Sequence, residues 1–154
     1  MLKVLVVSDS HGNTAKLGRI IRREAPFDVL VHCGDGAGDL IQVDIPQGAS
    51  VIRVSGNVDL ARNLDAERLV VQEIGDLTVM VSHGDEFRVH AGYEVIERSG
   101  RSHNADVVLF GHTHVAYHGE GRPVLLNPGP ATNGKYGLLH LGPALRAELK
   151  SLED

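Results

Sequence analysis

The sequence predicts an α/β fold in which two mixed β-sheets face each other and helices cover the outside. Two observations lead to this fold class. The first half of the chain alternates short apolar runs with loops and a helical pattern, which is typical of a parallel sheet with crossover helices. The second half contains closely spaced apolar runs joined by short turns, which favours antiparallel pairs. We expect one domain over residues 1–154, with about nine or ten strands and three helices.

The first half supplies three predicted parallel strands. The apolar, β-branched run Leu2–Val7 suits a strand buried on both faces. After a polar loop, Thr14 can cap a helix whose apolar residues recur at helical spacing until Pro26 ends it. Residues 27–33 and 50–54 are the next two apolar runs. Ligands of such sheets gather beyond the carboxyl ends of the strands.

The second half supplies a predicted hairpin, a short helix and the closing strands. Gly75-Asp76 separates two apolar runs, as in a hairpin, and residues 91–99 read as a helix that ends at Gly100. The apolar runs of this half, including the two that flank Gly75-Asp76, are each short enough to be strands. They cover residues 67–74, 77–81, 106–110, 115–118, 124–126, 136–141 and 145–149. The last two are expected to close the fold as antiparallel strands.

The composition indicates which partners to expect and in which cellular compartment the protein works. The net charge of −5 and the pI near 6.0 provide no basic field for a phosphate backbone, so general nucleic-acid binding is not expected. The single cysteine, Cys33, excludes an internal disulfide and fits a reducing, cytoplasmic compartment. The first apolar run is interrupted too soon by Asp9 to be a signal peptide or a membrane span. We therefore expect no membrane association.

Polar side chains that can bind metals follow five of the predicted strands. They are two carboxylates, one carboxamide and four imidazoles: Asp9, His11, Asp35, Asn57, His83, His112 and His114. Imidazole and carboxylate together suit manganese, iron, cobalt, nickel or zinc better than calcium. Seven side chains are too many for one ion, whereas two ions that share a carboxylate would use them all. A pair of ions about 3.5–4 Å apart can activate water and stabilise an in-line phosphoryl displacement.

Each of these motifs also has a structural interpretation when it is taken alone. Asp9-Ser10-His11 and Gly34-Asp35 can be turn features, Gly56-Asn57 is a common turn dipeptide, and His83 can be a hydrogen-bonded core histidine. For His112 and His114 the metal and structural interpretations are balanced. It is the joint occurrence of the motifs, in order and at successive strand ends, that favours a metal centre.

These residues carry a family resemblance. Asp9-Ser10-His11, Gly34-Asp35, Gly56-Asn57-Val58-Asp59, His83-Gly84-Asp85 and Gly111-His112-Thr113-His114, closed by Asn127-Pro128-Gly129, resemble the motifs of the calcineurin-like metallophosphoesterases. The short chain without a cap insertion is similar to the small bacterial and archaeal phosphodiesterases of that superfamily. The resemblance implies a four-layer αββα sandwich. It also implies Asp9, His11 and His114 on one metal ion, Asn57, His83 and His112 on a second, and Asp35 between the two.

The chain departs from many members of that superfamily at Val58, where they carry a histidine that is proposed to protonate the leaving group. Valine cannot donate a proton, so the general acid is unassigned, with His32 and His90 as candidates. Asp59, which would orient that histidine, is left with two interpretations, support of the metal site or a simple turn carboxylate. Arg62 and Arg88 are candidates for binding the substrate's second substituent.

The predicted function is hydrolysis of a small phosphodiester by attack of a metal-bridging hydroxide. The catalytic residues are expected to be Asp35, Asn57 and His83, with Asn57 also contacting the phosphoryl oxygens. Two divalent ions are implied, manganese first, with iron, nickel, cobalt or zinc as alternatives. Without a positioned acid, esters with good leaving groups should react best.

Three other functions remain open at this point. The retromer complex contains a subunit with this fold that acts chiefly as a scaffold, so the fold alone does not guarantee turnover. Phosphomonoester hydrolysis would use the same metals, and nuclease activity on short oligonucleotides is disfavoured by the acidic charge. A homodimer is plausible, but no segment of the sequence identifies an interface.

Overall fold

The computed structural model describes residues 1–154 and contains two five-stranded mixed sheets, which confirms the predicted fold class. The first sheet has the order β10 (Leu145–Ser151), β9 (Lys135–Leu141), β1 (Leu2–Val7), β2 (Val29–His32) and β3 (Ser50–Arg53). The second has the order β4 (Leu69–Ile74), β5 (Leu77–Ser82), β6 (Val107–Leu109), β8 (Val124–Asn127) and β7 (Tyr117–Gly119). Strands β1, β2 and β3 are parallel, as are β5, β6 and β8, and every other neighbouring pair is antiparallel.

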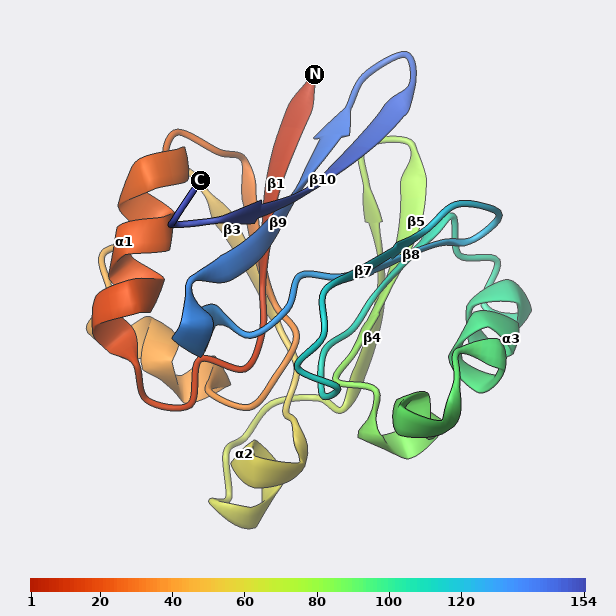
Figure 1. Cartoon of the computed structure of the whole chain (residues 1–154). Coiled ribbons are helices and arrows are strands. Elements are labelled where there is room, and N and C mark those ends of the chain that lie inside the picture. Colours follow the sequence, from red (N-terminus) through yellow and green to blue (C-terminus); the bar gives the residue numbers. More distant parts are fainter.

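The two sheets and the outer helices form four layers (Figure 1). Strand β1 shows why, because its side chains alternate between two apolar cores. Val4 and Val6 enter the core between the sheets, whereas Leu5 and Val7 pack toward α1 (Thr14–Glu24). On the far side of the second sheet, α3 (Glu94–Ser102) covers a third core. All four of these β1 residues are fully buried, as expected for a strand covered on both faces.

The helix boundaries correct two details of the sequence analysis. Asn13, not Thr14, caps α1, because its side-chain oxygen accepts the backbone N–H of Lys16 at 3.1 Å. Helix α3 continues through Gly100 to Ser102, so this glycine is not a terminator. A Cβ there would lie 2.6 Å from Cγ2 of Val108, and close packing of the helix on β6 is the reason for the glycine.

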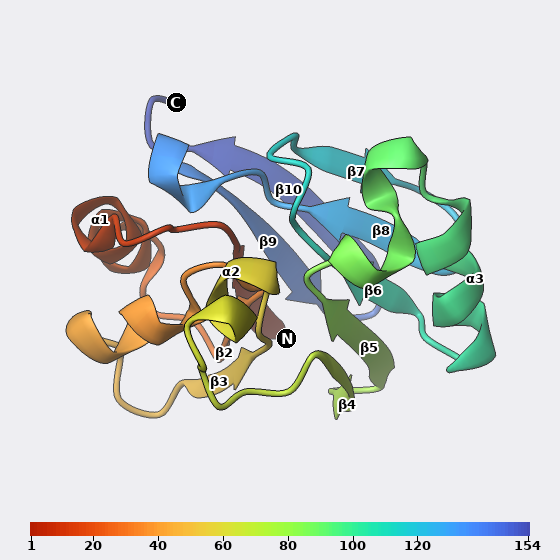
Figure 2. The same cartoon turned by 90° about the horizontal axis from the view of Figure 1, so that it is seen from below.

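The third helix, α2 (Asn57–Ala61), is short and lies in a segment where the sequence analysis does not place a helix. The other connections contain 3-10 turns at Ala37–Gln42, Asp85–Phe87, Val89–Ala91 and Ala131–Asn133. Figure 2 shows the molecule from the end at which α2 lies, with α1 and α3 on opposite sides. None of the helices combines the length and the apolar character needed to cross a bilayer.

Candidate metal centre

The predicted metal ligands follow parallel strands of the two sheets, six of them in loops and Asn57 at the start of α2. Five of the seven have a left-handed backbone, with φ between 45° and 71°. These five are Asp9, His11, Asp35, His112 and His114. A positive φ is uncommon for residues other than glycine and concentrates at functional sites, where the surrounding fold holds the side chain in a fixed direction. The cluster of such residues therefore marks this edge as a site in its own right.

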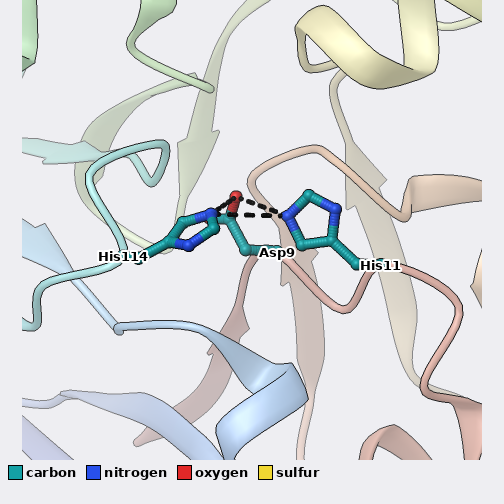
Figure 3. A group of neighbouring side chains, drawn as sticks. All are labelled: Asp9, His11 and His114. Atoms are coloured by element: carbon teal, nitrogen blue, oxygen red, sulfur yellow. Dashed lines mark hydrogen bonds and ion pairs between the residues drawn. The ribbon is translucent and has the colours of Figure 1, made fainter.

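The first group of converging side chains consists of Asp9, His11 and His114, which come from loops over 100 residues apart in sequence (Figure 3). The Nε2 atoms of the two histidines are 3.4 Å apart. Oδ1 of Asp9 lies 3.4 Å from Nε2 of His11 and 3.2 Å from Nε2 of His114. The three tips thus point at one small volume, and the group could hold a metal ion.

The second group consists of Asp35, His83 and His112 and could also hold a metal ion. Nε2 of His83 is 3.1 Å from Oδ2 of Asp35 and 3.2 Å from Nδ1 of His112. On the other side of its fully buried ring, Nδ1 of His83 donates to the carbonyl of Cys33 at 2.9 Å. That bond fixes the orientation of the ring and directs Nε2 toward the group, which is the usual way in which a protein orients a metal-binding histidine. The donors and their supporting bonds therefore fit a divalent ion.

The two groups adjoin each other. Nε2 of His83, in the second group, is 3.8 Å from Oδ1 of Asp9, in the first. His112 and His114 belong to different groups even though they are separated by one residue. This division agrees with what the family resemblance implies, and the assignment of the two histidines to different ions stays a prediction.

The charges of the second group are strongly coupled. Burial would raise the pKa of Asp35, but the hydrogen bond from His83 lowers it to about 2. Burial would lower the pKa of His83, but the hydrogen bond to Asp35 and the negative charge of Asp9 raise it. Burial and the nearby His83 lower the pKa of His112. The carboxylate is therefore ionised across the physiological range, and the carboxylates of Asp35 and Asp9 favour the charged form of His83.

Asp59 supports the loop that carries Asp35, which settles the two interpretations left by the sequence. Its buried carboxylate accepts the backbone N–H groups of Asp35 at 2.7 Å, Gly36 at 2.9 Å and Gly56 at 3.1 Å. The N–H of Val58 in turn donates to Oδ1 of Asp35 at 2.9 Å. A Cβ on Gly56 would lie only 2.1 Å from Oδ1 of Asp35, so this contact requires glycine. Helix α2 and the Asp35 loop are thus held together as one unit.

A second supporting network was not found from the sequence. The N–H of Gly34 donates to Nδ1 of His32 at 3.0 Å, so Nε2 of His32 carries the proton and donates to Oγ of Ser10 at 2.9 Å. Ser10 donates to Oδ2 of Asp39 at 2.7 Å, which also accepts the N–H of Gly12 at 2.8 Å. This chain anchors the loop of Asp9 and His11. The partners of Ser10 are far from it in sequence, so no local spacing could have revealed them.

The other residues named in the sequence analysis belong to neither of the two donor groups. His32 is fully buried, and burial lowers its pKa to about 4, so it cannot reach a substrate as an acid. The ring of His90 is exposed and its centre lies 4.5 Å from that of His112. Asn57 is exposed at the start of α2. Arg62 lines a cavity that begins at His11, whereas Arg88 is exposed outside that cavity.

Comparison with known proteins agrees with this geometry. Residues 2–141 match the model of the calcineurin-like phosphoesterase superfamily domain. The chain belongs to this superfamily. The calcineurin-like match covers every residue of both candidate metal groups. Since members of the family act on phosphoesters with divalent metal ions, the donor groups described above are the expected place for such ions in this chain.

Relatives in the calcineurin-like superfamily cover most of the chain. The chain is 32% identical over 134 residues to the probable metallophosphoesterase YsnB of Bacillus subtilis, covering 83% of this chain and 74% of the relative. It is 26% identical over 157 residues to the phosphodiesterase MJ0936 of Methanocaldococcus jannaschii, covering 92% and 91% of the two chains. The small, cap-less members are therefore its family context, as the resemblance implied.

Solved structures of other proteins share the fold. A predicted phosphoesterase from Streptococcus pneumoniae superposes with a TM-score of 0.79 at 21% identity and covers 97% of this chain and 89% of its own. Vps29 from Entamoeba histolytica in complex with zinc superposes with a TM-score of 0.70 at 18% identity and covers 97% and 99%. At these identities the likeness concerns the fold alone.

Proposed function

We propose that this protein is a phosphodiesterase that uses two divalent metal ions. The observation that supports this most directly is the contact between the two donor groups, in which Nε2 of His83 lies 3.8 Å from Oδ1 of Asp9. Two ions held by such adjoining groups would be close enough to act on one phosphoryl group. The relative named a phosphodiesterase, which matches 92% of this chain, supports a diester as the substrate.

The residues divide between the two ions as follows. Asp9, His11 and His114 would hold one ion, His83, His112 and Asn57 the other, and Asp35 would contact both. The mixture of imidazole and carboxylate fits manganese, and it also fits iron, nickel, cobalt or zinc. When bound, two such cations supply a water that loses its proton near neutral pH and neutralise charge on the phosphoryl oxygens.

The chain's own residues orient these parts. Two hydrogen bonds fix the direction of Asp35: its backbone N–H donates to the carboxylate of Asp59, and its side-chain Oδ1 accepts the N–H of Val58. Asn57 stands at the start of the adjacent helix and would contact a phosphoryl oxygen. Because Val58 cannot donate a proton, a leaving group must depart as a stable anion, and aryl diesters should be the best substrates. Arg62, which lines the neighbouring cavity, is better placed than Arg88 to contact the second substituent.

The experiment is to purify the protein without chelator and to measure metal content together with hydrolysis of an aryl phosphodiester. Wild type should bind two ions per chain and hydrolyse the diester faster than the monoester of the same aryl alcohol. Asp35→Asn should lose metal and activity, and His112→Ala and His114→Ala should each lose one ion, from different positions. If the rate of the chemical step does not depend on the pKa of the leaving group, the conclusion that the site lacks a general acid is wrong.

Two alternatives correspond to other outcomes of the same experiment. Bound metal without hydrolysis of any phosphoester would favour a scaffold. The likeness of the fold to Vps29 structures is the reason to test for this function. Faster hydrolysis of the monoester would favour a phosphomonoesterase. The homodimer, the absence of general nucleic-acid binding and the cytoplasmic location stay predictions.

A further inference from the structure

A cavity of about 320 Å³ opens beside the first donor group. His11 forms part of its wall, and the rest comes from the turn at Ala37–Gln42 and from α2 with the loop that follows it. Three other cavities lie on the surface, but no predicted metal ligand lines any of them. A group attached to a phosphorus atom at the donor groups would therefore find this cavity directly next to it.

The size and walls of the cavity suit a small organic group. Its volume exceeds the roughly 150 Å³ that accommodates a benzene ring. Val58 and Leu64 supply apolar surface, and three of the lining residues are glycines, which have no side chain to fill the space. Val58 occupies the position at which many relatives have histidine, so the residue that removes the acid also adds an apolar surface here.

The charges of the lining select against anions. The charged residues of the lining are three aspartates, Asp39, Asp59 and Asp65, and one arginine, Arg62, which give a net formal charge of −2. Two of these carboxylates cannot turn away, because backbone N–H groups of Gly12 and Gly36 hold Asp39 and Asp59 in place. A substituent with a second phosphate or a carboxylate would meet this fixed negative field at short range.

We infer that this cavity is the subsite for one organic substituent of the phosphoester, and that it accepts a ring-sized group without negative charge and rejects an anionic one. The inference rests on the proposed phosphodiesterase function. It makes the substrate class a diester with at least one uncharged or cationic substituent, and it excludes substrates whose substituents both carry further phosphates.

The test uses three inhibitors that each carry a single substituent: methylphosphonate, phenylphosphonate and 4-carboxyphenylphosphonate. Inhibition constants are measured against hydrolysis of an aryl diester by the metal-loaded protein. Phenylphosphonate should bind at least tenfold more tightly than methylphosphonate, and the added carboxylate should weaken phenylphosphonate binding at least threefold. Asp65→Asn should reduce that last penalty.

Two variants with a matched control locate the effect. Leu64→Ala should reduce the preference for phenyl over methyl about three- to tenfold by removing apolar contact. Leu60→Ala is the matched control, because it removes a leucine that lies on α2, is 56% exposed and does not line the cavity. It should leave the preference for phenylphosphonate over methylphosphonate unchanged. Gly38→Ala would place a Cβ 3.7 Å from Cδ1 of Leu64, an ordinary contact, so the variant should fold and bind phenylphosphonate less well.

The outcomes separate the subsite from the function. If the wild type hydrolyses the diester but prefers neither phenyl nor methyl, or if Leu64→Ala and Leu60→Ala behave alike, the subsite is wrong and the function stands. If the metal-loaded protein neither hydrolyses a phosphoester nor binds any of the phosphonates, the proposed function fails and the subsite with it. Melting temperatures of all variants identify any that are misfolded.

Discussion

Replacing Asp59 by asparagine should both destabilise the fold and disrupt the metal centre. The carboxylate accepts three backbone N–H bonds of 2.7 to 3.1 Å, from Asp35, Gly36 and Gly56. An amide has one acceptor oxygen, so in its best orientation it keeps the N–H partners of Oδ2 and turns its own N–H groups toward the N–H of Gly36. One charge-assisted bond is lost and the half-buried N–H of Gly36 is left unpaired, which costs about 1–3 kcal/mol in the free energy of unfolding.

The assay is urea unfolding of wild type and Asp59→Asn in the presence of a chelator, so that metal binding does not contribute. Asp65→Asn is the control, because it makes the same chemical change at an exposed carboxylate in the loop after α2. Metal content without chelator is the second readout, and it should fall for Asp59→Asn alone because the Asp35 loop loses its support. A variant within about 0.5 kcal/mol of wild type that also keeps its metal would refute this account of Asp59.

Two further predictions concern stability away from the centre. Burial would raise the pKa of Glu24, but hydrogen bonds from Lys150 and Tyr136 lower it from 4.5 to about 2. The folded-state pKa is thus the lower one, so the stabilisation, up to about 3 kcal/mol, is present above pH 4.5 and is lost as the pH falls toward 2. Glu24→Gln should flatten unfolding free energy over this pH range, and an unchanged profile would argue against the ion pairs. Gly100→Ala should cost about 1–3 kcal/mol, because its Cβ would lie too close to Val108. Gly18→Ala should be neutral or stabilising, because its Cβ would meet the flexible end of Arg22 and make an ordinary contact with Val43. Equal melting temperatures for the two alanine variants would contradict the close packing of α3.

The sequence determined the sheets and the candidate ligands because both are encoded locally. A run such as Leu2–Val7 is apolar at every position, and only a strand covered on both faces buries all of it. Residues that directly follow parallel strands gather at the carboxyl edge of the sheet, so Asp9 or His83 could be named as a candidate without coordinates. The same reasoning failed at element ends, where the cap at Asn13 and the passage of α3 through Gly100 depend on individual contacts.

Only the tertiary structure decided how the site is held together. The division of the donors into two adjoining groups depends on distances between loops more than 100 residues apart, as between Asp9 and His114. The role of Asp59 depends on how closely α2 approaches the Asp35 loop, and the burial of His32 removes it as an acid. A sequence pattern gives the order of residues along the chain, whereas these properties arise from the left-handed turns and hydrogen bonds that aim side chains from separate loops at one volume.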